Sequence, residues 1–463
     1  MADRLQRLIS RRRFVRGTAS MSAGLFGLAI AGCSSSNNNG NNKKANTSAP
    51  PAASQAAAAT TVAATRAATA AAGASPAASA AASPAAARSP AASNLKLSGD
   101  VGMGFISSFT GPLAPIYAEF VAGAKLAVDE INGQGGIGGA KLTLEQADDQ
   151  SNPAQVPAAA LGVVDKKLHF CIGPIGSNAI SASPALNQAK IIQCGYSDNP
   201  ELADAAKFPY SFRFVWSAEQ SSKLLVDYFT EQLKLTKIAI LAENTVYGQT
   251  DAPTTAKYMD SLSLKPTVNE YFQPGTADFT PLLRKVQDAG SQAIVWWTQG
   301  GPEGITVLKN MNDIKLDMPI AGIGLGPAAA VKGVVPDTLL DKTLTVYWKR
   351  LTYSDAEPIS QKVKDWNQRL ANAGGLGKIG SGGTSPFYDF VYYMKAGIEA
   401  TGGTDSTAIA KYMESTPYDG IVANFDGITA KDHTIVKDGA ISLGTLSSWN
   451  ATDKVFLKRP AGL

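Results

Sequence analysis

Short apolar runs alternate with helix-like segments from Leu95 to the end of this 463-residue chain. The runs that we expect to form strands are 101–106, 141–146, 170–173, 191–195, 237–242, 292–298 and 318–323. Helical patterns follow or precede them, as at 115–132 and 153–167. Strands that alternate with helices are typical of parallel sheets with helices on both faces. Because the series of strand–helix units occurs twice over, the sequence predicts an α/β fold of two Rossmann-like lobes with parallel sheets.

Residues 34–94 contain too few large apolar side chains to form part of such a core. An Asn-rich stretch at 37–42 leads into a drift of Ala, Ser, Thr and Pro with almost no large apolar side chain. A segment of this kind buries too little apolar surface to fold, and its prolines interrupt any Ala-rich helix. We therefore predict a disordered linker with a root-mean-square reach of roughly 45 Å.

The first 33 residues have the pattern of an export signal. Arginines at 11–13 and 16 precede an apolar segment at 19–31, which is shorter than the about 20 residues that a membrane span needs. The arginine pattern resembles the twin-arginine export motif. Ile-Ala-Gly-Cys at 30–33 resembles the bacterial lipobox, which implies that Cys33 is a lipid attachment point. The alternative to an export signal is an amphipathic first helix. The alternative to a lipid attachment point is a cysteine that is present at this position by chance.

The charge distribution argues against a nucleic-acid partner. The formal charge of the chain is +4, from 42 basic and 38 acidic residues. Residues 1–94 hold ten of the basic residues and one acid, so 95–463 keep 32 basic and 37 acidic residues and a net charge of −5. The part that we expect to fold is mildly acidic and has no basic patch with interleaved aromatic residues.

The residues that usually carry enzyme or metal chemistry are scarce. The chain has His169 and His433 as its two histidines, and Cys33, Cys171 and Cys194 lack the spacing of metal ligands. The nucleophile-elbow and phosphate-loop motifs are also missing from the sequence. We therefore predict no metal site, no cofactor and no enzymatic activity. An enzyme on the same scaffold, with His433 as its candidate catalytic group, is the alternative.

The loops that follow the expected strands are the places to look for a ligand, because parallel sheets bind ligands at the carboxyl ends of their strands. These loops span 107–117, 174–178, 196–199, 243–247 and 299–301. They are rich in Ser, Tyr, Asn, Gln and Gly, which are residues that grip a small polar molecule without reacting with it. The alternative is that these loops are polar merely because loops lie at the surface.

An ordered set of short motifs resembles one known family. The motifs are Thr-Gly-Pro-Leu at 110–113, the helix 123–132, the glycine turn 135–139, and the pairs or loops at 148–149, 173–177, 212–213, 247–248, 278–279 and 432–433. In this order they resemble the solute-binding proteins of branched-chain amino acid ABC transporters, across essentially all of 95–463. The resemblance implies the type I periplasmic binding fold, a monomer that delivers a small-molecule solute to a membrane permease, and a location outside the cytoplasm.

The same resemblance implies how the part of the chain after the expected export signal (1–33, with the lipobox) and the expected linker (34–94) divides. Lobe one is expected over 95–217 plus about 350–423, and lobe two over 218–349 plus about 424–463. A hinge of three chain crossings would join the lobes near Ser217, near 347–352 and near 423–426.

Candidate site residues follow from the resemblance residue by residue. Ser177 would help to hold a ligand carboxylate, Tyr247 would pack over the ligand, and Glu219 would meet an ammonium group. Trp297 and Gln299 would face the cleft from the end of a strand. The remaining candidates lie in the first lobe and are Tyr117, Tyr196, Ser197 and Asp198.

Two departures from the family pattern bear on the ligand. Asp198 stands where a neutral hydroxyl residue is usual, and 327–330 holds only Pro and Ala where branched-chain binders present an acid. An unpaired buried ammonium is costly, so an amide, a urea-like compound or an aromatic acid competes with an amino acid as the expected solute. A sensor that presents its ligand to a membrane receptor is the alternative to transport. Cys171 and Cys194 end two neighbouring strands, so both a disulfide and two buried free thiols remain open.

Overall fold

The computed structural model describes residues 95–176, 179–300, 302–325, 328–377, 382–449 and 457–463. The expected export signal, Cys33, the linker 34–94 and Ser177 lie outside the described residues. Within the described part of the chain, no helix combines the length and the hydropathy that crossing a bilayer requires. The architecture is α/β, with two main sheets.

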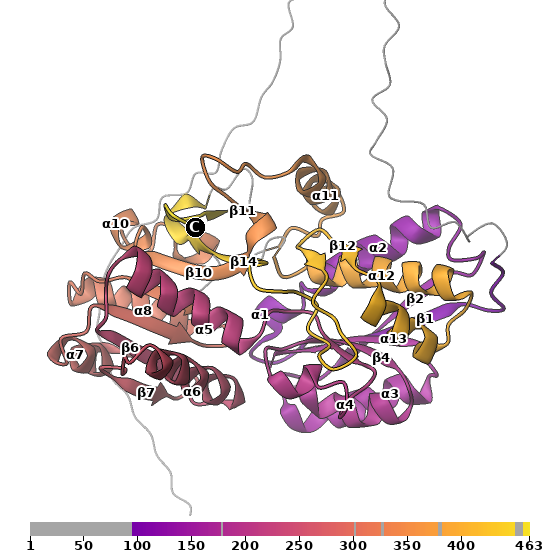
Figure 1. Cartoon of the computed structure of the whole chain (residues 1–463), viewed down its shortest axis with the longest axis horizontal. Coiled ribbons are helices and arrows are strands. Elements are labelled where there is room, and N and C mark those ends of the chain that lie inside the picture. Colours follow the sequence, from indigo (N-terminus) through magenta and orange to yellow (C-terminus); the bar gives the residue numbers. More distant parts are fainter. Residues whose placement is uncertain (1–94, 177–178, 301, 326–327, 378–381, 450–456) are drawn as a thin grey trace, which may run out of the picture. The chain divides into compact units, whose positions relative to one another are not determined.

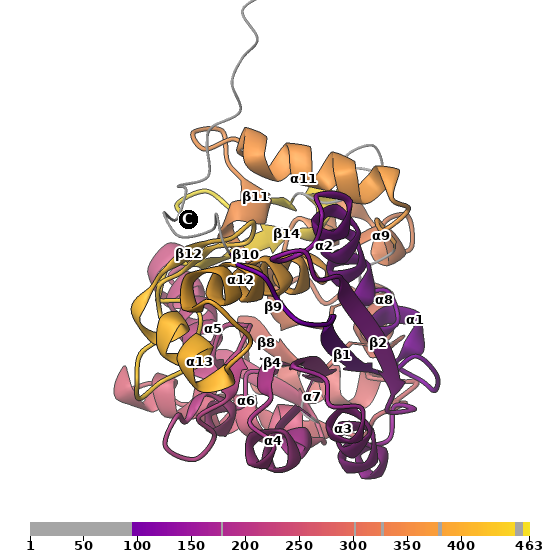
Figure 2. The same cartoon turned by 90° about the vertical axis from the view of Figure 1, so that its right-hand side faces the viewer.

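The first sheet is fully parallel and has the strand order β2-β1-β3-β4-β5. Its strands are β1 Val101–Ser107, β2 Leu142–Asp148, β3 Phe170–Ile175, β4 Ile192–Tyr196 and β5 Ser211–Arg213. Helices α2 (Val121–Gly133) and α12 (Ser385–Thr401) pack on one face, and α3 (Val156–Asp165) and α4 (Ala179–Gln188) pack on the other (Figures 1 and 2). Because both faces are covered, a central strand such as β1 is buried along its whole length.

The second sheet has the order β11-β15-β14-β10-β9-β8-β6-β7. Its strands are β6 Ile238–Glu243, β7 Asn269–Phe272, β8 Ala293–Trp297, β9 Ile320–Ile323, β10 Thr343–Trp348, β11 Thr352–Tyr353, β14 Ile441–Thr445 and β15 Leu457–Lys458. The strands from β6 to β10 are parallel, and β14 is antiparallel to β10. Helices α5 (Ala218–Asp227) and α6 (Val246–Ser261) pack against each other, while α7 (Thr280–Asp288) and α8 (Pro302–Asp313) contribute to a separate apolar cluster.

Shorter elements complete the described structure. They are α1 Ala114–Tyr117, α9 Ala328–Val331, α10 Asp337–Leu340, α11 Gln361–Asn372, α13 Ser406–Ser415, β12 Tyr418–Asp419, β13 Asn424–Phe425, the π-helical turn Tyr228–Gln232, and the 3₁₀ turns Pro153–Gln155, Pro200–Ala203, Lys349–Leu351 and Leu446–Ser448. The predicted α/β fold with parallel sheets is confirmed. The predicted helix 115–132 is two helices, α1 and α2, and the predicted strands do not include β5, β7, β10 or the C-terminal strands.

The chain passes between the two sheets at three places. At the first, Ser217 caps α5: its hydroxyl accepts the N–H of Gln220, and the Gln220 side chain accepts the N–H of Ser217, at 3.1 and 2.9 Å. The second lies after Tyr353, later than expected, because β11 still pairs within the second sheet. The third lies after Thr434, also later than expected, because Thr434 bridges to β5 in the first sheet. We propose the lobe boundaries at these positions.

Cys171 and Cys194 are buried free thiols, so the disulfide alternative is wrong. In the register of β3 and β4, Cys171 lies opposite Gln193 and Cys194 lies opposite Ile172. Because side chains alternate along a strand, the two sulfur atoms point to opposite faces of the sheet. Burial raises the pKa of both thiols, which keeps them protonated and unreactive.

A thiol titration checks this placement. We expect a Cys33→Ser variant, unfolded without a reductant, to react at two thiols per chain, and the folded protein to react at neither. The reason is that both sulfur atoms are buried and unpaired in the described structure. Loss of both thiols from the unfolded, unreduced chain would show that they are bonded and would contradict the register of β3 and β4.

Candidate functional site

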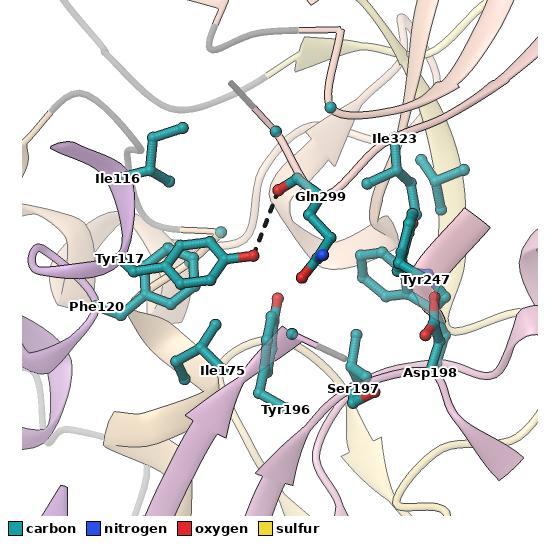
Figure 3. Close-up of a pocket in the computed structure, with 18 of the residues that line it drawn as sticks. Ile116, Tyr117, Phe120, Ile175, Tyr196, Ser197, Asp198, Tyr247, Gln299 and Ile323 are labelled. Atoms are coloured by element: carbon teal, nitrogen blue, oxygen red, sulfur yellow. Dashed lines mark hydrogen bonds between the residues drawn. The ribbon is translucent and has the colours of Figure 1, made fainter. Parts of the chain in front are cut away.

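A cavity of about 240 Å³ lies where strands of both sheets end (Figure 3). The first sheet contributes loop residues after β3 and β4, together with α1 and Phe120. The second sheet contributes α6, the loops after β8 and β9, and the end of β10. The cavity therefore lies at the strand ends that the parallel topology predicts for a ligand.

Aromatic side chains dominate the wall of this cavity. They are Tyr117, Phe120, Tyr196, Trp216, Tyr247, Tyr347 and Trp348. Several of them pack on one another: the rings of Tyr117 and Phe120 are stacked at 5.4 Å, and those of Trp216 and Trp348 meet edge to face at 4.9 Å. A site with this lining presents flat apolar surfaces and a few hydroxyl groups to a small organic molecule.

Six of the predicted site residues line the cavity. They are Tyr117, Tyr196, Ser197, Asp198, Tyr247 and Gln299. Ser177 lies outside the described residues, although the preceding Gly176 lines the cavity. The topology brings these residues together from segments far apart in the sequence.

Two predicted site residues do not line it. Trp297 is fully buried, and its indole N–H donates to the hydroxyl of Thr255 in α6 at 3.1 Å. It packs in the same apolar cluster as Tyr247, so it lies beneath the cavity wall and not in it. Its ring lies 6.4 Å from that of Tyr247 and supports it from within the core. Glu219 is exposed in the first turn of α5, where a carboxylate interacts favourably with the helix N-terminus.

Sequence reasoning missed several lining residues. Trp216 belongs to the first crossing between the sheets, and Tyr347 and Trp348 end β10, which we had treated as hinge. Asp251 is fully buried, interacts electrostatically with Asp198 of the cavity wall, and was also missed. The signal for Asp251 was available, because it stands four residues after Tyr247 and therefore on the same face of α6.

Polar contacts join the two sides of the cavity. The Tyr117 hydroxyl donates to the backbone carbonyl of Gln299 at 3.4 Å, a long bond that links α1 to the loop after β8 (Figure 3). That loop is fixed in turn by Glu243, whose carboxylate accepts the Thr298 hydroxyl at 3.0 Å and the Gln299 N–H at 3.1 Å. On the hinge side, the Tyr347 hydroxyl accepts the N–H of Gly382 at 3.1 Å.

Asp198 is the acidic residue of the cavity wall and is buried. Burial raises its pKa to about 6, against the opposing effects of the neighbouring Asp251 side chain and of the nearby Arg213 charge. Burial and the Asp198 charge raise the pKa of Asp251 well above its usual range. The Arg213 guanidinium donates to the backbone carbonyls of Asp198 and Asn199, at 3.2 and 3.4 Å, and so fixes this loop.

Both histidines form contacts within the fold and away from the cavity. His433 is buried, stacks on Phe212 at 4.1 Å, and has its Nδ1 atom 2.9 Å from the carbonyl of Ser211. His169 Nδ1 accepts the N–H of Gly102 at 3.1 Å. Neither lines the cavity, and among the described residues no three His, Cys, Asp or Glu side chains are grouped so that they could hold a metal ion.

Comparison with known proteins agrees with this architecture. The family model of the periplasmic binding proteins matches residues 100–443. An amino acid binding protein of Pseudomonas aeruginosa is 27% identical over 335 residues, which cover 69% of this chain and 83% of that protein.

Two solved structures show the same fold. The branched-chain amino acid transporter substrate-binding protein LivJ of Streptococcus pneumoniae, in complex with isoleucine, superposes with a TM-score of 0.64 at 22% identity and covers 78% of this chain and 100% of its own. A solute-binding protein of an ABC transporter from R. palustris, in complex with benzoate, gives a TM-score of 0.64 at 18% identity and covers 75% of this chain and 93% of its own.

Proposed function

We propose, from the premise that this chain belongs to the periplasmic binding protein family, that it is the solute-binding lipoprotein of an ABC importer. It captures a small organic solute outside the cytoplasm, holds it unchanged between two lobes and delivers it to a membrane permease. The solute is an amino acid, a related amide, a urea-like compound or an aromatic acid. The relatives bound to isoleucine and to benzoate support this range of solutes.

The observation that carries the proposal is that the cavity takes its wall from both sheets. Tyr117, Tyr196 and Asp198 come from the first sheet, and Tyr247 and Gln299 come from the second. A ligand that contacts both sides stabilises the closed arrangement, whereas a ligand that contacts one side leaves the equilibrium between open and closed states unchanged. Solute binding and closure are thereby coupled, and the closed form is the one that would dock on the permease.

Uptake measurements test the transport function. A solute that raises the melting temperature of the purified protein is supplied in labelled form to cells that have or lack this protein. We expect uptake to fall when the protein is missing and to return when it is restored. Unchanged uptake, together with a lost cellular response to the solute, would favour a sensor instead.

Mass spectrometry of protein from its native cells tests the proposed anchor. We expect a mature chain that begins at Cys33 and carries two or three acyl chains, because one chain alone binds membranes only marginally. A Cys33→Ala variant should keep its leader and lose the lipid, while a Cys171→Ala variant should be processed like the parent. A native chain that still begins at Met1 would contradict the anchor.

A further inference from the structure

We propose that the solute is a small protonated amine, whose ammonium group binds the Asp198 carboxylate while its apolar body lies among the aromatic rings. This inference rests on the proposed function as a solute-binding protein and changes its solute class, because the amine carries neither the carboxyl group of an amino acid or aromatic acid nor the carbonyl group of an amide or urea. It gives Asp198 the role of the specificity-determining residue, with Asp251 as the residue that positions it.

The charge of the cavity wall supports a cationic ligand. Among the described residues that line the cavity, Asp198 is the one acid, and there is no Lys, Arg or His. Asp198 is 5% exposed, so its charge is largely withdrawn from water. A buried charge without a partner is unfavourable, and a ligand cation would supply the missing partner.

Asp251 keeps Asp198 in position and ionised. Asp251 is fully buried, and its two carboxyl oxygens receive no hydrogen bond from an N–H or O–H group of the described residues. Its electrostatic neighbour is the Asp198 carboxyl, whose charge adds to the effect of burial in raising the pKa of Asp251. Two neighbouring buried carboxyl groups hold one proton between them. With that proton on Asp251, its O–H group can donate to one oxygen of Asp198, and lone pairs of the Asp198 carboxylate remain for a ligand in the cavity.

The charges around this pair leave it with an excess of negative charge. Arg213 is the nearby cation, and it interacts with Asp432 and Glu219 as well as with Asp198. The Arg213 side chain also donates to the Thr434 hydroxyl, and its hydrogen bonds near Asp198 go to backbone carbonyls, not to the carboxylate. The Arg213 guanidinium is therefore shared among several acids. Among the described residues, no cation is hydrogen-bonded to the Asp198 carboxylate.

The Tyr247 hydroxyl is a second, independent observation that points to a ligand with hydrogen-bond donors. Its side chain lines the cavity and is 7% exposed, and its hydroxyl oxygen has no hydrogen-bond partner among the described residues. Tyr247 interacts electrostatically with both Asp198 and Asp251, so the hydroxyl lies at the same end of the cavity (Figure 3). An ammonium group has three N–H donors and can satisfy this hydroxyl together with the carboxylate. The aromatic faces around it attract the same positive charge.

Matched compounds test the inference by calorimetry and thermal shift on the Cys33→Ser chain. One set is benzylamine, benzamide and benzoate, and the other is 3-methylbutylamine, 3-methylbutanamide and 3-methylbutanoate. Within each set the apolar body is constant and the polar head changes. We expect the amine of at least one set to bind more tightly than its amide and its carboxylate.

Variants locate the contact. The Asp198→Asn variant should bind the amine at least about tenfold more weakly, because losing a hydrogen bond between charged groups lowers affinity by more than tenfold. Its affinity for the amide should be unchanged or higher. Asp251→Asn keeps a donor for Asp198 and should retain amine binding, whereas Asp251→Leu should weaken it. Asp260→Asn, an exposed change on the same helix, is the control and should bind like the parent.

The outcomes separate this inference from the proposed function. If a carboxylate, an amide or leucine binds more tightly than the amines, the inference is overturned, while the proposed function as a solute-binding protein still stands. Equal amine affinity in the parent and in a folded Asp198→Asn variant would also overturn it. If no member of either set and no amino acid binds, both the amine inference and the proposed solute range are contradicted.

Discussion

A Gly176→Val variant should lose solute binding while it remains folded. Gly176 lines the cavity with φ +79°, a conformation that is unfavourable for a β-branched residue. A Cβ atom at this position would lie 2.6 Å from the Gln299 side-chain oxygen and 3.0 Å from the Tyr117 hydroxyl. These two groups belong to opposite sides of the cavity, so the added side chain fills the space for the solute and holds the sides apart. We expect affinity to fall by about a hundredfold or more, which corresponds to about 2.7 kcal/mol.

Calorimetry with any solute that binds the parent measures this loss. The matched control is Gly162→Ala in α3, where a Cβ atom meets nothing within 4 Å. That change should leave affinity unchanged and stabilise the helix by about 0.5–1 kcal/mol, because Gly is unfavourable within a helix. Unchanged affinity in a folded Gly176→Val variant would place the solute elsewhere.

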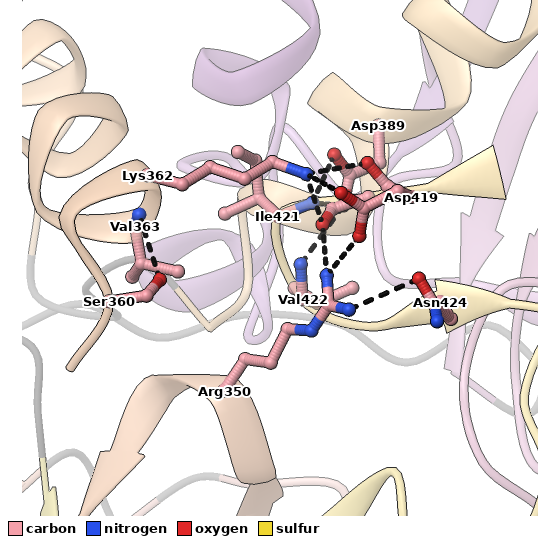
Figure 4. A network of polar contacts seen from close by, with 10 residues as sticks. Arg350, Ser360, Lys362, Val363, Asp389, Asp419, Ile421, Val422 and Asn424 are labelled. Atoms are coloured by element: carbon pink, nitrogen blue, oxygen red, sulfur yellow. Dashed lines mark hydrogen bonds and ion pairs between the residues drawn. The ribbon is translucent and has the colours of Figure 1, made fainter. Parts of the chain in front are cut away.

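An Asp389→Ala variant should lose about 2–5 kcal/mol of unfolding free energy, since two buried donors would be left unsatisfied. Asp389 lies in α12 and is 1% exposed. Its carboxylate accepts the N–H of Ile421, at 2.8 Å, and the N–H of Val422, at 3.1 Å (Figure 4). The same turn carries Asp419, which pairs with Arg350 and Lys362 at 2.7 Å beside the second crossing. Loss of Asp389 would therefore loosen the segment next to the hinge.

Denaturant unfolding of the Cys33→Ser chain and its variants measures this effect. Asp260→Ala, an exposed change with no side-chain partner among the described residues, should lie within about 0.5 kcal/mol of the parent. Asp389→Asn retains an acceptor for the N–H groups of the turn, so its unfolding free energy should lie between those of Asp389→Ala and Asp260→Ala. Equal unfolding free energies for Asp389→Ala and Asp260→Ala would show that these hydrogen bonds contribute nothing.

The pH dependence of stability follows from the same residue. Burial raises the pKa of Asp389 from 3.8 to about 7, although the N–H groups of Ile421 and Val422 oppose the shift. The folded state then holds this proton more tightly than the unfolded chain does. The resulting stabilisation is complete below about pH 4 and disappears as the pH rises through about 7. We expect the parent to lose unfolding free energy between pH 5 and pH 8, and Asp389→Asn to lose less.

Much of the fold could be predicted from the sequence because β1, β3, β4, β6, β8 and β9 are short apolar runs between helices. Other strands depend on their tertiary partners. β7 reads Asn-Glu-Tyr-Phe and is half exposed at a sheet edge, and β10 is defined by its pairing with β9 and with β14, almost 100 residues later. A local pattern contains no information on such pairings, so the second and third crossings were placed too early.

The candidate site also contains residues that could be predicted from the sequence and residues that could not. Residues in loops after strands, such as Ser197 and Gln299, could be predicted because the topology of a parallel sheet fixes where those loops lie. Trp216 and Trp348 could not, because they reach the cavity through the crossings between the sheets. The place of Trp297 could not be predicted because alternation along a strand gives the face on which a side chain lies and not its depth beneath a cavity wall.

The most direct test of the account is a crystal structure of the complex with a solute that raises the melting temperature. We predict that the solute lies in the aromatic cavity and contacts both sides of it, Tyr117 and Asp198 on one and Tyr247 on the other. A solute bound outside this cavity, or in contact with residues of one sheet alone, would contradict the account.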